Sequence, residues 1–256
     1  MSKIRIAAVG DIHVGLNDDL PDFGDVADLA DMLLLAGDLT RRGTREEAER
    51  LAELLASISI PVIAVLGNHD HHSDAAAEVS QIVESAGALV LEQSATSVTV
   101  DDTIIGIVGA KGFGGGMSGV AATAFGEPEM KAFALHGAPI ASAVQSCLAS
   151  LDTDLRILLL HYSPVRDTLE GEPPEIHAFL GDYRLAEVAD HAGCDLILHG
   201  HAHRGRERGR TPGGIPVRNV ARPVIRAPFR VFEIGVDALH DRTPEFASAK
   251  TGTRSS

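Results

Sequence analysis

Residues 62–72 read VIAVLGNHDHH, in which an apolar run from Val62 to Leu66 is followed at once by a glycine, an asparagine, an aspartate and three histidines. A short apolar run that ends at a glycine is typical of a buried strand. The polar residues then stand at the end of that strand. Three interpretations of the histidines are open at this point: metal ligands, acid or base catalysts, or a solvated turn.

Length and composition indicate one large domain. The chain has 256 residues, 45% of them hydrophobic, which is enough for a sizeable core. We expect a single domain over residues 1–236 and a polar, poorly ordered tail over residues 237–256. Because neither a leader segment nor a long apolar run follows Met1, we expect a cytoplasmic protein that does not enter a membrane.

The charge of the chain limits its partners. The formal net charge is −14, whereas duplex nucleic acid and anionic membranes both demand a basic surface. The only two cysteines, Cys147 and Cys194, lie outside any C-x-x-C spacing, so we expect small core residues and no disulfide or zinc knuckle. A small-molecule substrate therefore fits the composition better than nucleic acid.

Short apolar runs alternate with helical patterns, which predicts an α/β layered fold. Thr44 to Glu47 has the sequence of a capping box ahead of one helix, and Asp74 is expected to cap the next. The segment over residues 111–137 is rich in glycine and predicts a loop or lid. It is not a phosphate-binding loop of the Walker type, because no Gly-Lys-Ser/Thr follows its glycines.

Five apolar runs end in polar residues of one chemical kind. These residues are Asp11 and His13, then Asp38, then Asn68 with His69 and Asp70, then His161, and finally His201 and His203. Taken singly, each would be a helix cap, a turn residue or a core histidine. Taken together they predict a site, because the carboxyl ends of strands converge on the ligand crevice of α/β sheets. Oxygen and nitrogen donors of this kind suit Mn, Fe or Zn, and they exceed what one ion can use.

In chain order the motifs are D-x-H, G-D, G-N-H-D, H and G-H-x-H. With these motifs in this order, the sequence resembles the calcineurin-like metallophosphoesterases. The resemblance spans nearly all of residues 4–203. It implies a four-layer α/β fold in which two packed mixed β-sheets are flanked by helices. It also implies two divalent or mixed-valence metal ions, Mn, Fe or Zn. One ion is held by Asp11, His13, Asp38 and His203, and the other by Asp38, Asn68, His161 and His201.

The chemistry of such a centre gives the neighbouring residues expected roles. Two ions about 3.5–4 Å apart lower the pKa of a shared water towards ~7, and the bridging hydroxide attacks phosphorus. His69 would act as the general acid for the leaving oxygen, and Asp70 would fix the tautomer and orientation of its ring. In an extended stretch, His71 would point to the same side as His69 and line the rim, whereas His72 would point away. For both residues, a solvated turn before the next helix is the favoured interpretation.

Arginines next to the predicted ligands are candidate substrate contacts. Arg42 lies close behind Asp38 and Arg204 follows His203, so both are candidates to steer an anion, together with His71 at the rim. Charged runs of this type are otherwise solvated faces.

The function predicted from these residues is hydrolysis of phosphate esters, with small-molecule phosphodiesters favoured. A diester carries one charge and can rely mainly on the ions, whereas a monoester generally needs further cations that an acidic chain supplies less readily. Residues around His161 are also loosely similar to bacterial cyclic-nucleotide phosphodiesterases. The alternatives are a phosphomonoesterase or protein phosphatase, and a non-catalytic metal-binding scaffold, which would be expected to have lost His69 or ligands.

Overall fold

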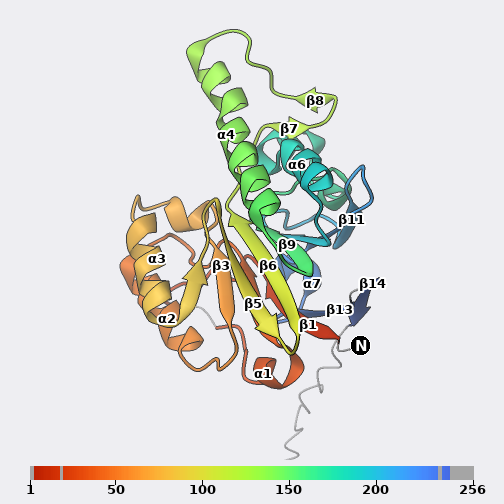
Figure 1. Ribbon diagram of the computed structural model, residues 1–256. Coiled ribbons are helices and arrows are strands. Elements are labelled where there is room, and N and C mark those ends of the chain that lie inside the picture. Colours follow the sequence, from red (N-terminus) through yellow and green to blue (C-terminus); the bar gives the residue numbers. More distant parts are fainter. Residues whose placement is uncertain (1–2, 18–19, 236–237, 243–256) are drawn as a thin grey trace, which may run out of the picture.

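The computed structural model describes residues 3–17, 20–235 and 238–242. Two six-stranded mixed sheets form the centre of the molecule, and helices flank them on both outer sides (Figure 1). The first sheet has the strand order β14-β13-β1-β2-β3-β4 and the second β11-β12-β10-β9-β6-β5. The expected α/β fold with two packed mixed sheets is therefore confirmed.

The strands have the following bounds. In the first sheet they are β1 Ile4–Val9, β2 Met32–Ala36, β3 Val62–Val65, β4 Ala88–Val90, β13 Arg230–Gly235 and β14 Ala238–Arg242. In the second they are β5 Ser94–Val100, β6 Thr103–Ala110, β9 Leu155–Leu160, β10 Leu196–His199, β11 Arg208–Arg210 and β12 Pro216–Asn219. A small hairpin is formed by β7 Gly116–Met117 and β8 Val120–Ala121.

The helices pack on the outer faces of the sheets. The α-helices are α1 Val26–Leu29, α2 Arg45–Leu55, α3 Ala76–Ser85, α4 Pro128–Ser150, α5 His177–Leu180, α6 Arg184–Ala192 and α7 Arg222–Ile225. Short 3₁₀ turns are η1 His69–His71, η2 Asp167–Leu169 and η3 Pro174–Ile176. In Figure 1, α2 and α3 lie on one outer side and α4 and α6 on the other.

Alternating side chains of the strands build three apolar layers. Ile6, Leu34 and Ile157 belong to the layer between the two sheets, where Leu196 and Leu198 also lie buried. A second layer joins the first sheet to α2 and α3, and a third joins the second sheet to α4 and α6. Since central parallel strands are covered on both faces, their sequences read as continuous apolar runs.

The capping residues follow the prediction at one helix and not at the other. The Thr44 side chain accepts a hydrogen bond from the Glu47 backbone N–H and caps α2, as predicted. Asp74 does not cap α3, which begins one residue later than an Asp74 cap would allow, after Ala75. Asp74 instead adopts a left-handed backbone conformation in the preceding turn, with φ of 57°.

The glycine-rich segment over residues 111–137 is not one loop. It contains β7 and β8, and its last ten residues are the first turns of α4, which begins at Pro128. Gly137 lies inside α4, although glycine favours a loop in the sequence. A Cβ at this position would lie 2.0 Å from Asp182 Oδ2, so glycine is needed here for the close approach of Asp182 to the helix and not for backbone freedom.

Part of the predicted tail is also ordered, because residues 238–242 form β14 against β13. Residues 237 and 243–256 lie outside the described residues.

Candidate metal centre

The predicted ligands follow strands of both sheets at one end of the molecule. Asp11 and His13 follow β1, and Asp38 follows β2. His161 directly follows β9 of the second sheet, and His201 follows β10. Backbone hydrogen bonds tie these loops to one another, among them His13 N–H to the Asp38 carbonyl at 3.0 Å. The sheets therefore bring residues that are far apart in sequence into one cluster.

Several of these residues have a strained backbone. Asp11, His13, Asp38 and His201 have φ between 46° and 69°, and they are four of the eight described non-glycine residues with positive φ. Such conformations cost of order 1–3 kcal/mol each and are concentrated at functional sites. The loops here adopt them at the positions from which the side chains enter the cluster.

Asp11, His13 and His203 form the first group, whose potential ligand atoms lie within 4.8 Å of one another. His203 Nε2 is 2.8 Å from Asp11 Oδ1. His13 Nε2 is 4.0 Å from the same oxygen and 3.8 Å from Asp38 Oδ2, and it is buried with no hydrogen-bond partner. A buried, unpaired ring nitrogen that faces two carboxylates is what a metal ion would satisfy.

Asp38, His161 and His201 form the second group. The His161 ring donates its Nδ1–H to a backbone carbonyl at the end of β2 (2.9 Å), so Nε2 is directed at Asn68 Oδ1, 2.9 Å away, and at Asp38 Oδ1, 3.4 Å away. His201 donates Nε2–H to the Phe179 carbonyl at 3.3 Å, which leaves Nδ1 for a ligand. These outer hydrogen bonds fix the tautomers in the way that metal-bound imidazoles require.

The electrostatics of the cluster favour neutral histidines and call for added positive charge. Burial lowers the pKa of His13 to about 4 and that of His201 to about 3, so both are neutral at pH 7, the form that binds metal. Burial raises the pKa of the Asp38 carboxyl, against the effect of His161. Burial acts in the same direction on Asp11, but the hydrogen bond from His203 and the charge of His161 outweigh it and lower the pKa.

Two motif glycines leave room for these carboxylates. A Cβ at Gly67 would lie 2.1 Å from Asp38 Oδ1, and a Cβ at Gly200 would lie 2.3 Å from Asp11 Oδ2. Both glycines are therefore needed for the carboxylates to occupy their positions. A further group, His13, Asp38 and His69, shares His13 with the first group and Asp38 with the second. The donor set, the unpaired nitrogen of His13 and the presence of Asp38 in two of these three groups together fit two ions.

His69 lies at the edge of the first group. Its ring centroid is 4.5 Å from that of His13, and its Nε2 is 3.9 Å from Asp38 Oδ2. Its Nδ1–H donates to the Arg41 backbone carbonyl at 2.7 Å. This hydrogen bond to the Arg41 carbonyl orients the His69 ring so that Nε2 faces the cluster.

The structure corrects the role expected for Asp70. Its buried carboxylate accepts hydrogen bonds from Leu39 N–H, Thr40 N–H, the Thr40 hydroxyl and Gly67 N–H, at 2.6–3.1 Å. Among the described residues, none of its hydrogen bonds reaches the His69 ring. Asp70 ties the loop after β2 to the loop after β3, and the Arg41 carbonyl has the orienting role that the sequence assigned to Asp70.

His71 and His72 are exposed and lie in a turn before α3, but the directions expected from an extended stretch are wrong. Residues 69–71 form a 3₁₀ turn, in which side chains three residues apart point the same way. His72 therefore lies on the side of His69, and together with Arg41 and Arg42 the two line an open cavity of about 560 Å³. His71 does not line this cavity.

The two candidate arginines have different surroundings. Arg42 lines the cavity beside His69, as its proposed contact with substrate requires. Arg204 is exposed, and its backbone N–H donates to Glu172 Oε1 at 2.7 Å, but no hydrogen bond or ion pair joins its side chain to the ligand groups in the described part of the chain.

Sequence reasoning missed two residues of this region, Lys111 and Tyr162. The Tyr162 ring centroid is 4.4 Å from that of His201, and the Lys111 Nζ is 5.4 Å from the Tyr162 ring. Lys111 follows β6 and Tyr162 follows β9, so both could have been found from their positions at the ends of strands, as the ligands were.

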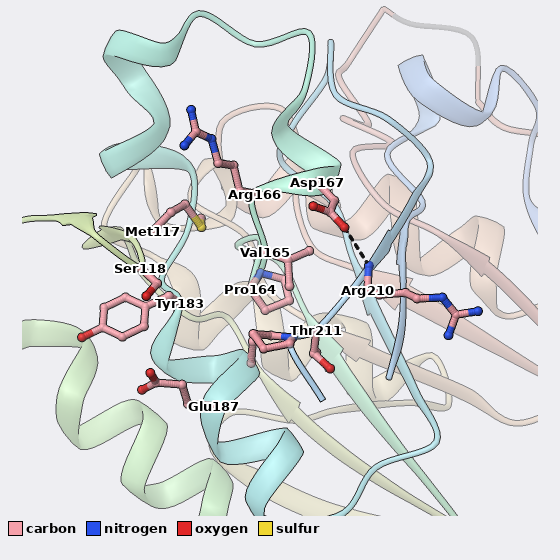
Figure 2. Close-up of a pocket in the computed structure, with 12 residues that line it drawn as sticks. Met117, Ser118, Pro164, Val165, Arg166, Asp167, Tyr183, Glu187, Arg210 and Thr211 are labelled. Atoms are coloured by element: carbon pink, nitrogen blue, oxygen red, sulfur yellow. Dashed lines mark hydrogen bonds between the residues drawn. The ribbon is translucent and has the colours of Figure 1, made fainter. Parts of the chain in front are cut away.

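A separate cavity of about 360 Å³ lies beside α6 and contains none of the predicted ligands. Figure 2 shows Tyr183 and Glu187 on one side of it and Asp167 and Arg210 on the other. The Arg210 backbone N–H donates to Asp167 Oδ2 at 3.2 Å. Since it has no histidine and no paired ligand group, the reaction is not placed there.

Solved structures share the fold of this chain. A phosphopantetheinyl hydrolase from Mycobacterium tuberculosis is 17% identical, with a TM-score of 0.66 over 96% of this chain and 99% of that one. A protein from Thermus thermophilus is 16% identical, with a TM-score of 0.53 over 93% of this chain and 98% of that one. Among curated proteins, none matches the chain.

The model of one protein family, described as calcineurin-like phosphoesterase, matches residues 4–205, which include every predicted ligand. Members of that family hydrolyse phosphate esters at a dinuclear divalent metal centre, and the ligand groups described above provide residues for one. The chain therefore belongs to the calcineurin-like phosphoesterase family and is a phosphoester hydrolase.

Proposed function

We propose that this chain is a metal-dependent phosphodiesterase that acts on small-molecule substrates. The observation that supports metal-dependent hydrolysis most directly is the position of Asp38, whose two oxygens face different histidine groups. Oδ2 faces His13 Nε2 at 3.8 Å and Oδ1 faces His161 Nε2 at 3.4 Å. A carboxylate between two sets of neutral imidazoles is suited to be shared by two ions.

The proposed ligand sets follow from this arrangement. One ion is held by Asp11, His13, Asp38 and His203, and the other by Asp38, Asn68, His161 and His201. When bound, the ions supply Lewis acidity at the phosphoryl group and activate the attacking water. The oxygen and nitrogen donors suit Mn, Fe or Zn, and elemental analysis of the purified protein identifies which of these is bound.

His69 is proposed to donate a proton to the leaving oxygen. The Arg41 carbonyl accepts the Nδ1–H at 2.7 Å, so the opposite nitrogen, Nε2, faces the ligand groups and can carry the transferred proton. Placed general acids of this kind contribute about 10²–10⁴ in rate.

The space around His69 supports a diester. The cavity formed by His69, His72, Arg41 and Arg42 has a volume of about 560 Å³, within the usual range of small-molecule sites. A leaving group larger than a hydroxyl therefore has room on the side where its oxygen is protonated. The net charge of −14 also favours a substrate with one negative charge over one with two.

One observation favours a second candidate, a phosphomonoesterase. Arg41 and Arg42 line the same cavity, and guanidinium groups are suited to bind a dianionic phosphate in a bidentate manner. If both side chains point to the phosphoryl group, the acidic balance of the chain no longer argues against a monoester.

The experiment compares kcat/KM for bis-p-nitrophenyl phosphate and p-nitrophenyl phosphate with Mn²⁺-loaded protein. We expect the diester to be at least about tenfold better, a difference of about 1.4 kcal/mol in transition-state stabilisation. A better monoester would support the phosphatase. In that case Arg42→Ala should lower kcat/KM, and Arg204→Ala, which changes an exposed arginine outside the cavity, is the matched control.

We further propose that residues 1–236 act as one catalytic domain in the cytoplasm. The shared apolar layer between the two sheets supports one domain. By length and composition alone, α4 is the one described helix able to cross a membrane, but Ile140, Val144 and Leu148 of that helix pack in the core. Fractionation of the tagged protein tests the location.

A further inference from the structure

Lys111 is held between two aromatic rings. It follows β6 directly, and its Nζ lies 5.5 Å from the Phe113 ring centroid and 5.4 Å from that of Tyr162. Ammonium groups within about 6 Å of a ring centroid are attracted to the ring face. The two rings therefore fix the position of this cation without neutralising it.

The ammonium lacks an acidic partner although its side chain is largely buried. Its one hydrogen bond is to the Gly112 carbonyl at 3.4 Å, and it forms no ion pair with any residue that the structure describes. Glu92 accepts from the Lys111 backbone N–H and not from Nζ. Removing a charge from water without pairing it is costly, so a cation in this state is poised to receive an anion.

Lys111 adjoins the second ligand group, because its backbone carbonyl accepts a hydrogen bond from His161 N–H at 3.1 Å. Burial lowers the pKa of Lys111, against the charges of Glu92 and Asp38, and burial together with Lys111 lowers the pKa of His71. Tyr162 connects it to the second ligand group, with its ring 4.4 Å from that of His201. Lys111 and His69 thus lie at different ends of the pair of ligand groups, because His69 contacts His13 of the first.

A row of aromatic rings continues from Lys111 to the surface. Phe113 lies 5.7 Å from Phe133, and Phe133 lies 5.6 Å from Phe179, all between ring centroids. Phe179 is 59% exposed, and its backbone carbonyl accepts the hydrogen bond of His201. The chain has eight phenylalanines, two tyrosines and no tryptophan, and four of these ten rings gather beside the second ligand group.

We propose that Lys111 and the rings of Phe113, Phe133 and Phe179 form a substrate subsite for a phosphodiester whose non-leaving arm carries a flat aromatic ring. Lys111 binds a phosphoryl oxygen, and the exposed face of Phe179 stacks with the ring of that arm. This subsite rests on the proposed function, since it assigns the second arm of the diester to the side opposite His69. It explains why a surface ring and an unpaired ammonium are found next to a metal ligand.

The experiment uses two diesters with the same leaving group, phenyl p-nitrophenyl phosphate and methyl p-nitrophenyl phosphate. We expect KM to be lower for the phenyl diester. Phe179→Ala should remove about fivefold of that preference, because it deletes the ring and keeps the carbonyl that holds His201. Phe125→Ala is the matched control, since Phe125 is 85% exposed and lies outside the row.

A direct binding measurement separates this inference from the activity. Titration calorimetry of the metal-loaded protein with phenyl phosphate and methyl phosphate gives the two dissociation constants. We expect Lys111→Met to weaken both about tenfold, because it removes a charge-assisted hydrogen bond and keeps the aliphatic stem between the rings. Lys111→Arg should restore most of the binding, and Lys131→Met, which removes an exposed lysine of α4, should change neither constant.

The outcomes distinguish the subsite from the function. If wild-type protein hydrolyses no diester but binds phenyl phosphate in a Lys111-dependent way, the subsite stands and the diesterase proposal fails. If diesters are hydrolysed but Lys111→Met binds like Lys131→Met, or the wild type does not prefer the phenyl arm, the subsite is wrong. Should Lys111→Met fail to fold, Phe179→Ala decides, and an unchanged preference for the phenyl arm overturns the inference.

Discussion

Replacing Asp70 by asparagine tests whether this residue anchors two loops or serves the His69 ring. One carboxylate oxygen of Asp70 accepts from Thr40 N–H at 2.8 Å and from the Thr40 hydroxyl at 2.6 Å. The other accepts from Gly67 N–H at 2.7 Å and from Leu39 N–H at 3.1 Å. All the groups around the carboxylate can donate, so a side-chain amide cannot replace it without turning its own NH₂ towards N–H groups.

The expected loss of stability follows from the number of hydrogen bonds that the Asp70 carboxylate accepts. If the amide nitrogen takes the place of the second oxygen, two buried backbone N–H groups lose their acceptor. Hydrogen bonds to a charged group contribute about 1.5–3 kcal/mol each, so the substitution should destabilise the fold by about 3–6 kcal/mol. For a chain of this size, about 1 kcal/mol shifts Tm by about 2–4 °C, which gives a fall of about 6–24 °C.

The assay is thermal unfolding by circular dichroism, together with kcat for an alkyl and a nitrophenyl leaving group at a temperature where the variant is folded. Asp74→Asn is the control, because Asp74 is exposed and has a left-handed backbone that asparagine also tolerates. We expect the Asp70 variant to lose stability and to lose activity equally for both leaving groups. An unchanged Tm with a loss confined to the alkyl leaving group would refute the anchoring role and restore a role in orienting the His69 ring.

Three further predictions follow from the site and the core. Asp38→Ala should lose both metal ions and activity together, because its carboxylate faces both ligand groups, and elemental analysis that still finds two ions would contradict the shared position. His69→Ala should keep both ions and slow hydrolysis more for an alkoxide leaving group than for nitrophenolate, since the latter scarcely needs a proton; equal losses would exclude the general acid role. Burial raises the pKa of the Cys194 thiol to about 12, so alkylation of native protein at pH 8 should spare Cys194 and modify Cys147, which mass spectrometry of the peptides can show.

The α/β layering and the convergence of polar residues at strand ends could be predicted from local sequence features, whereas the two packed sheets were implied by the resemblance to the metallophosphoesterases. Apolar runs such as those ending at Ala36 and Leu160 fix buried parallel strands, and the polar residue after each run must appear at the carboxyl edge. The resemblance then implied which of these residues share an ion, among them Asp38 and His161. The packing of the two sheets against each other then places His161 Nε2 3.4 Å from Asp38 Oδ1.

The orientation of side chains within the loops could not be predicted in the same way. The prediction for His71 and His72 assumed that the strand continues, whereas the backbone turns at His69 into a 3₁₀ helix. That turn is fixed by contacts from distant loops, including the hydrogen bond from His69 N–H to Asp38 Oδ1 at 2.8 Å. Side chains repeat every two residues in a strand but every three in a 3₁₀ turn, so His72, and not His71, lies on the same side as His69.

Lys111 illustrates a different limit. As the first residue after β6 it met the positional rule that identified the ligands, but a lysine donates no electron pair to a metal while it is protonated, so no metal motif includes it. The glycines that follow Lys111 resemble those of phosphate-binding loops, but no Gly-Lys-Ser/Thr follows them, so that interpretation was excluded. What distinguishes this lysine is an absence that only the fold reveals: its ammonium is enclosed by Phe113 and Tyr162 and lacks a carboxylate partner among the described residues. An unpaired charge is a property of the assembled site, and it points to a substrate group as the missing partner.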